Sequence, residues 1–229
     1  NFIGPQNLYT WDALQKYPER FTGAACYDPF CRKSGEVRKH LFEDLGFKIV
    51  KFEVSDGSGL MSYHREFPLD GEMMEEAMEY AEAHGITAVF DIGRRGGCCW
   101  QPYALAELIK RHKNMQFVVC HLLAPQGRSY ENEWRDAMRA LNQENVVFDL
   151  ASLPHNQKPE PYPYPTAVWF IKEAIQILGQ DRLMWGSDLP SNLCRDTYLY
   201  DYILNSAELT EKEKESILGK TAERIYFGH

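Results

Sequence analysis

The feature that most constrains the fold is a regular alternation of short apolar segments with longer amphipathic ones. The apolar segments are rich in β-branched and aromatic residues, and they predict strands at residues 21–27, 47–54, 87–91, 115–121, 146–150 and 182–185. Helical periodicity predicts helices at 36–45, 72–84, 104–112, 132–142 and 166–178, and over the tail 198–227. Strands and helices that alternate at this spacing predict βαβ units and a parallel sheet, buried on both faces.

The loops that follow the predicted strands are long and polar, and candidate functional residues gather there. This layout is typical of the active face of a (β/α)₈ barrel, although an open doubly wound sheet with the same alternation remains an alternative. The sequence contains no glycine-rich phosphate-binding fingerprint, which disfavours an open dinucleotide-binding sheet.

Three polar residues stand where predicted strands end. His121 follows the apolar run 117–120, Asp188 follows the segment 183–187, and Asp91 follows 88–90. A polar side chain that closes a buried strand must find a partner or meet a ligand, so these residues are candidate catalytic or metal-binding groups. For Asp188 and Asp91 the structural alternative is a capping role in the loop that follows, and for His121 a hydrogen bond to a neighbouring strand.

Four charged residues form a second tier of candidates. Lys51 and Glu53 alternate along one strand and therefore share a face, which predicts either a mutual ion pair or a contact with substrate. Arg94 and Arg95, in the loop after residue 91, could clamp a substrate carboxylate or simply be solvated.

Loop residues after other strands are weaker candidates for the pocket mouth. His64 and His155 lie in long loops, and Tyr162 and Tyr164 lie in the proline-rich segment 154–165. Because proline fixes φ, this segment is expected to be stiff, and it either walls the pocket or merely connects two units.

Composition narrows the class of protein. The net charge of −8, with acidic and basic residues mixed along the chain, argues against a nucleic-acid partner. No apolar stretch is long enough to cross a membrane, and the first residues do not resemble a signal peptide. The six cysteines match no zinc-finger or redox spacing, so we expect reduced thiols in a cytoplasmic protein, with a redox switch at Cys98–Cys99 as the alternative.

Four segments carry a resemblance to a known family. In chain order they are residues 17–21 (YPERF), 46–52 (GFKIVKF), 120–122 (CHL) and 186–190 (GSDLP). On these segments the whole chain resembles the amidohydrolase superfamily, in the amidohydrolase-related branch that includes the aminocarboxymuconate-semialdehyde decarboxylase type. The last segment, together with His121 upstream of it, is the most specific.

The resemblance implies a single TIM-barrel domain over residues 1–229, a (β/α)₈ barrel of which the chain covers about strands 3 to 8. The family's His-X-His of the first strand is absent, so an N-terminal segment carrying the first two strands is expected to precede Asn1. The resemblance also implies one divalent metal, usually zinc, with Asp188 as the eighth-strand ligand and His121 as the sixth-strand histidine. Asp91 stands where the family has a fifth-strand histidine, which fits manganese, zinc or a site that has lost its metal.

The resulting functional prediction is a metal-dependent hydrolase that acts on a small molecule through metal-activated water. Asp188 would accept the proton of that water, and His121 would stabilise the oxyanion or protonate the leaving group. The alternatives are a non-oxidative decarboxylase of the same family and a metal-free barrel that binds a small molecule without catalysis. The expected partner is a small-molecule substrate, with no nucleic acid and no membrane, and the resemblance implies a homodimer.

Overall fold

The computed structural model describes residues 4–189 and 199–228, so Pro190 of the GSDLP segment and Cys194 lie outside the described residues. The chain divides into two compact units, Asn1–Val118 and Val119–His229, and the division falls within a strand. We describe each unit by itself.

The first unit is built from parallel strands and the helices that connect them. Neighbouring strands β1, β2 and β3 pair in chain order, with Ala25 opposite Val50 and Phe52 opposite Phe90. In sequence order the elements are α1 (Asn7–Lys16), β1 (Ala24–Ala25), α2 (Ser34–Lys39), η1 (His40–Asp44), β2 (Ile49–Glu53), α3 (Leu60–Tyr63), α4 (Glu72–Ala83), β3 (Thr87–Asp91), α5 (Pro102–Arg111) and β4 (Phe117–Val119).

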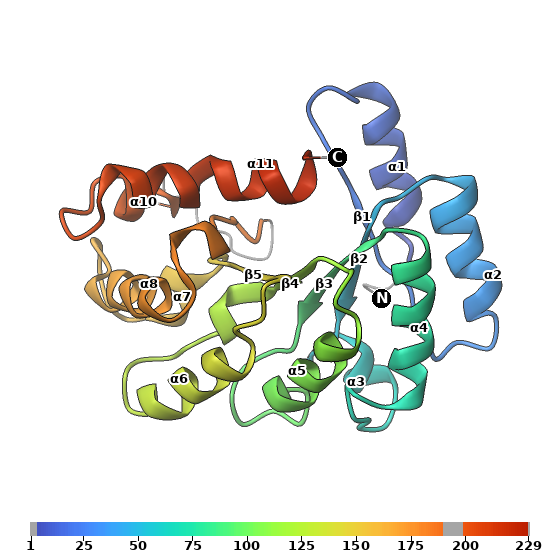
Figure 1. Ribbon diagram of the computed structural model, residues 1–229, viewed down its shortest axis with the longest axis horizontal. Helices are drawn as coiled ribbons and strands as arrows, with labels where there is room; N and C mark the ends of the chain where they lie inside the picture. The colour runs from blue at the N-terminus through green and yellow to red at the C-terminus, as the bar shows by residue number, and fades with distance from the viewer. Residues whose placement is uncertain (1–3, 190–198, 229) are drawn as a thin grey trace. The chain divides into compact units, whose positions relative to one another are not determined.

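An aromatic row along one face of these strands forms the core of the first unit. The rings of Phe52 and Phe90 lie 5.1 Å apart, and that of Phe117 follows at 6.3 Å from Phe90. All three side chains are fully buried. Helices α2 and α4 lie beside the strands (Figure 1), where the Arg38 guanidinium sits 4.8 Å from the centre of the Tyr80 ring. Because side chains alternate along a strand, the residues of β2 on either side of Phe52 point to the face opposite the aromatic row.

The second unit continues the alternation of strand and helix. Strands β5 and β6 pair in parallel, with Asp149 opposite Met184. The elements are η2 (Cys120–Leu123), α6 (Glu131–Ala140), β5 (Val146–Asp149), α7 (Leu153–Asn156), α8 (Pro165–Leu178), η3 (Gln180–Arg182), β6 (Leu183–Met184), α9 (Asp201–Leu204), α10 (Glu211–Glu215), η5 (Ser216–Lys220) and α11 (Thr221–Tyr226).

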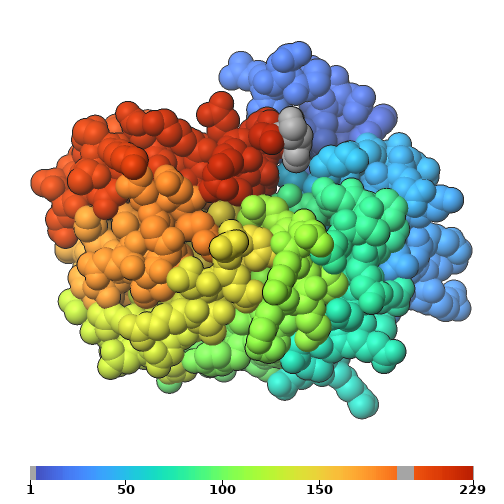
Figure 2. Space-filling view, in the orientation of Figure 1, coloured from blue at the N-terminus to red at the C-terminus, as the bar shows by residue number. Residues whose placement is uncertain are grey.

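A side-chain hydrogen bond joins helix α10 to helix α8 in the second unit. Thr210 forms a capping box with Glu213 at the start of α10. The Glu213 carboxylate also receives a hydrogen bond from Lys172 Nζ of α8 at 3.1 Å. Figure 2 shows the surface of the C-terminal helices, in red, continuous with that of α8, in orange.

The predicted strands agree with the structure in position, but several are shorter. The prediction for 87–91 is confirmed at both ends by β3. The prediction that a strand runs to His121 is wrong, because β4 ends at Val119 and the backbone then turns. The apolar run misled the prediction because Cys120 stays buried although it already belongs to the turn. No helix in residues 4–189 and 199–228 has the length and apolarity needed to cross a membrane.

Candidate active site

His121 stands in an unusual turn directly after β4. Residues His121, Leu122, Leu123 and Ala124 all have positive φ, at 60°, 51°, 63° and 48°. A non-glycine residue pays roughly 1–2 kcal/mol for this conformation, because Cβ approaches the following carbonyl. Four such residues in succession need strong compensation from their surroundings.

Hydrogen bonds from the end of β5 and from the loop after it offset part of this cost and orient the His121 ring. The His121 backbone N–H donates to Asp149 Oδ1 at 2.9 Å, and ring atom Nδ1 lies 3.0 Å from the carbonyl oxygen of Ala151. A carbonyl oxygen can only accept, so Nδ1 carries the hydrogen and, in the neutral ring, Nε2 keeps its lone pair. The ring is therefore held with Nε2 as its proton-accepting atom.

Asp188 is held by the same loop. Its backbone is also left-handed, at φ 54°, and its Oδ2 accepts a hydrogen bond of 2.5 Å from Ser152 Oγ. Two residues earlier, a Cβ on Gly186 would come within 3.0 Å of Ala151 Cβ, so the glycine lets the two segments approach closely.

The loop 149–152 thus connects both candidate catalytic residues. Asp149 accepts from the backbone N–H groups of His121 and Ala151, at 2.9 and 3.0 Å. The same Asp149 oxygen lies 4.0 Å from His121 Nδ1, and the two side chains are only 15% and 13% exposed. Ser152, which holds Asp188, itself has a φ of 60°.

Backbone strain at these positions is an observation that points to function. His121, Ser152 and Asp188 all occupy the left-handed region. Strained non-glycine residues persist only where the surrounding structure holds them in place, and they cluster at active sites. Asp149 and Ser152 were not among the residues predicted from the sequence. Asp149 could have been found by the strand-end rule that singled out His121, whereas Ser152 carries no sequence signal.

The first unit contains its own polar face. Lys51 Nζ lies 3.7 Å from Glu53 Oε2, which confirms the predicted mutual pair. Glu53 is the register partner of Asp91, so the two carboxylates share one side of the sheet, opposite the aromatic row. Asp91 Oδ1 also accepts from the backbone N–H of Gly93 at 2.9 Å, which is the loop-capping role foreseen as its alternative.

The remaining predicted residues lie in loops and at the surface. Arg94 and Arg95 are exposed, as is His155 in α7. In the proline-rich segment the Tyr162 and Tyr164 rings lie 6.0 Å apart, edge to face. Roles for these residues in substrate binding remain predictions.

Tyr164 and Tyr162 join the proline-rich segment to the region of α9. The Tyr164 ring lies 5.9 Å from that of the buried Tyr202, and Asn205 Nδ2 donates to the Tyr162 hydroxyl at 3.4 Å. The segment is therefore packed within the second unit rather than being a loose connection.

The cysteines within the described residues are all free thiols: Cys26, Cys31, Cys98, Cys99 and Cys120. Burial raises the pKa of the Cys99 thiol to about 11. A neutral thiol is a poor nucleophile, so Cys99 is unsuited to a rapid redox switch.

The described site offers few groups that could ligate a metal ion. His121 and Asp188 are residue types that zinc and manganese accept. However, within residues 4–189 and 199–228 no group of three or more His, Cys, Asp or Glu side chains could hold a metal ion. A catalytic zinc needs three protein ligands, so the described residues do not by themselves fit a metal site.

The sequence model of a protein family described as amidohydrolase matches residues 2–228. No curated protein matches the chain.

Similar solved structures include an amidohydrolase from Burkholderia multivorans with bound zinc, at 18% identity and a TM-score of 0.76, covering 97% of this chain and 78% of that one. A TIM-barrel protein from Bordetella bronchiseptica matches at 19% identity and a TM-score of 0.73, covering 96% and 71%. A dihydroxybenzoic acid decarboxylase from Polaromonas sp. JS666, with bound manganese and the inhibitor 2-nitroresorcinol, matches at 12% identity and a TM-score of 0.66, covering 96% and 73%. The predicted α/β TIM-barrel fold is confirmed.

Proposed function

The chain belongs to the amidohydrolase family, and on that premise we propose that it is an enzyme that hydrolyses a small molecule, with His121 and Asp188 as its catalytic residues. The observation that carries the proposal is that both residues are held in strained left-handed conformations by one loop, 149–152. Such backbone strain raises the free energy of the folded state, and strained residues cluster at functional sites, where the strain is part of the mechanism.

The geometry suits proton transfer by His121. Its Nδ1–H is engaged by the Ala151 carbonyl, so proton exchange with a substrate takes place at Nε2. Once Nε2 has taken a proton the ring is cationic, and the Asp149 carboxylate 4.0 Å from Nδ1 stabilises that charge. His121 can therefore take a proton and return it to the leaving group.

Asp188 is the second proton acceptor. Ser152 fixes one carboxylate oxygen, Oδ2, which orients the group, and we assign the other oxygen, Oδ1, to the attacking water. In the proposed step Asp188 accepts a proton from the attacking water, and His121, which has first taken a proton from solvent at Nε2, gives that proton to the leaving group; Asp188 then returns its proton to solvent.

We propose a divalent metal, zinc or manganese, as cofactor, because the Burkholderia structure holds zinc and the Polaromonas structure holds manganese. The described residues do not complete its ligand set, so the proton transfers above are derived without it. Elemental analysis of the purified protein, before any chelator is used, tests this. About one equivalent per chain, lost in Asp188→Asn, supports the metal. A metal-free protein whose activity no added metal raises overturns it.

Hydrolysis is tested by screening esters, lactones and amides, followed by single substitutions. His121→Ala and Asp188→Asn should each lower kcat at least about a hundredfold, since general acid–base groups contribute 10²–10⁴. His40→Ala, at an exposed histidine to which no role in the site is assigned, is the control and should leave kcat within about twofold. Full activity in either catalytic variant would overturn the assignment, and a chain that binds but never turns over substrate would favour a non-catalytic binding protein.

Decarboxylation is the second candidate, favoured by the similarity to the Polaromonas decarboxylase. Its substrate would carry a carboxylate, which the exposed guanidinium of Arg94 or Arg95 could bind. Release of CO₂ from hydroxybenzoates, without consumption of esters or amides, would decide for this reaction. Arg94→Ala and Arg95→Ala should then raise KM.

A further inference from the structure

We propose that the first unit contains a binding site for a small organic cation, an aromatic or arylalkyl amine, in the cavity beside the Asp28–His64 pair. None of the residues that line this cavity is one to which the proposed hydrolysis is assigned. Its test needs no turnover, so it stands or falls independently of that reaction.

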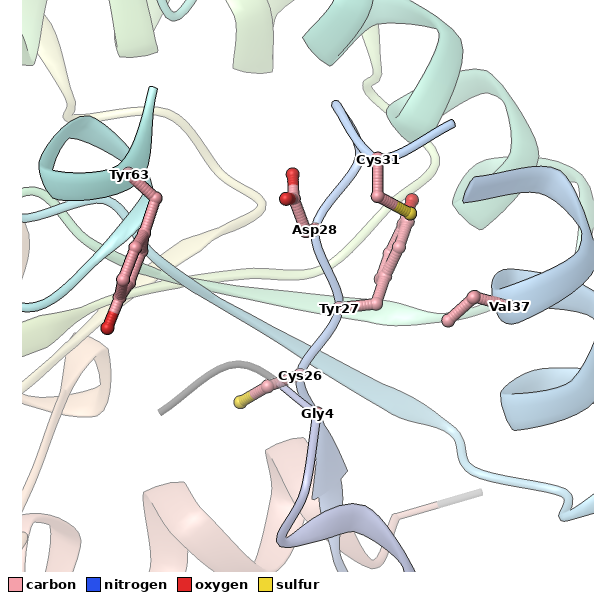
Figure 3. A pocket seen from close by; sticks show the side chains of 7 residues that line it. All are labelled: Gly4, Cys26, Tyr27, Asp28, Cys31, Val37 and Tyr63. Atoms are coloured by element: carbon pink, nitrogen blue, oxygen red, sulfur yellow. The ribbon is translucent and has the colours of Figure 1, made fainter. Parts of the chain in front are cut away.

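The cavity is defined by residues from three segments of the first unit. It has a volume of about 410 Å³ and is lined by Gly4, Cys26, Tyr27, Asp28, Cys31, Val37 and Tyr63. Figure 3 shows the Asp28 side chain between Tyr63 on one side and Cys31 on the other. This volume falls within the usual range of small-molecule pockets, and an apolar lining with a single charged group is typical of them.

Asp28 is held rigidly at the cavity wall. Its Oδ2 lies 2.7 Å from His64 Nε2, and its Oδ1 accepts from the backbone N–H of Phe30 at 2.8 Å. Cys26, two residues before Asp28, is also held in place. The buried Asn7 side chain donates to the Cys26 carbonyl at 2.6 Å and accepts from the Cys26 N–H at 2.9 Å. Each Asp28 oxygen still has a second lone pair for a ligand.

The short helix α3 ends directly before His64 and so places this side chain beside Asp28. A Cβ on Gly59 would lie 2.4 Å from the Glu53 carbonyl oxygen, so only glycine allows the tight loop from which α3 starts. The His64 ring packs 5.1 Å from that of Phe30, which in turn lies 4.3 Å from Phe67. The contact between His64 and Asp28 is thus built into the fold, with side chains 29% and 23% exposed.

The charge of the lining selects the ligand. Of the lining residues, Asp28 alone is formally charged at neutral pH, since burial raises the pKa of both Tyr27 and Cys26 and keeps them neutral. The lining therefore places one carboxylate beside the rings of Tyr27 and Tyr63. A carboxylate next to aromatic faces favours an ammonium group that can donate to Asp28 and lie over a ring.

A metal ion is a poorer fit for this cavity. Within the part of the chain that the structure describes, no group of three or more metal-ligating side chains was found. An organic ammonium ion needs only one carboxylate and an apolar wall, both of which the cavity supplies.

Protection of Cys31 from alkylation tests the proposal on the whole, unmodified chain. Benzylamine, benzyl alcohol and benzoate have similar shapes and differ in charge, and iodoacetamide labelling is followed by mass spectrometry. Saturating benzylamine should slow labelling of Cys31 about tenfold or more, while the exposed Cys98, outside the cavity lining, reacts as before. Equal protection by benzyl alcohol or benzoate, equal protection of Cys98, or no protection would each overturn the proposal.

A matched pair of substitutions tests the role of the carboxylate. Asp28→Asn keeps an oxygen for the Phe30 N–H but removes the charge, and should raise the half-protecting benzylamine concentration about tenfold. Asp44→Asn is the control, because Asp44 forms a similar pair with His40, at 3.0 Å, on the exposed surface. An Asp28→Asn protein that protects Cys31 like wild type, or an equal loss in Asp44→Asn, would contradict the assignment to Asp28.

Discussion

Replacing Asp149 by alanine should destabilise the second unit more than any single loss at the surface. One carboxylate oxygen, Oδ1, accepts from two backbone N–H groups, those of His121 and Ala151, at 2.9 and 3.0 Å. The alanine variant leaves both donors without that acceptor. It also removes support from the left-handed turn that begins at His121.

The magnitude follows from these contacts. A buried donor that loses its partner costs about 1–3 kcal/mol, so two donors set a range of about 2–6 kcal/mol. The Asp149 side chain is 15% exposed, so water can replace part of the loss, and the strained turn can relax once it is released. We therefore expect a loss of about 3 kcal/mol in the free energy of unfolding, in the lower half of that range.

Urea unfolding, followed by circular dichroism, measures this loss. Asp149→Asn is the matched control, because its amide oxygen can still accept both hydrogen bonds, and it should lose less than about 1 kcal/mol. An alanine variant within about 0.5 kcal/mol of wild type would show that Asp149 does not support the turn. An asparagine variant as unstable as the alanine variant would show that the charge, rather than the hydrogen bonds, stabilises it.

Three further predictions concern other contacts. Ser152→Ala removes the hydroxyl that orients Asp188, and kcat should fall about tenfold with little change in KM, whereas an unchanged kcat would remove Ser152 from the mechanism. Gly59→Ala should lower stability by about 1–3 kcal/mol in thermal unfolding, because its Cβ would meet the Glu53 carbonyl, whereas Gly57→Ala, with open space around it, should be nearly neutral. A hydrogen bond from His112 lowers the pKa of Glu82 below its ordinary value of 4.5, so its contribution to stability is present above that pH and is lost as the pH falls further. Glu82→Gln should reduce that acid-sensitive loss in pH-dependent unfolding, and an unchanged acid profile would count against the prediction.

Local sequence was sufficient for the elements whose burial is uniform. Strand β3 was predicted at both ends because all five of its residues are buried and a glycine follows closely. Strand β1 is shorter than predicted because Phe21, although aromatic, is 53% exposed and pairs with no strand. Helix α3 was missed because it spans only four residues, too few for a periodic pattern to show.

The sequence by itself determined the alternating α/β architecture, the family and the choice of His121 and Asp188, because these depend on local composition and on residues next to strand ends. Only the tertiary structure decided how those two side chains are held. Their partners in the loop 149–152 lie 28 to 36 residues away along the chain. No local propensity favours four successive left-handed residues after β4. That conformation exists because hydrogen bonds from a distant loop outweigh its steric cost, and such bonds form only once the strands have folded side by side.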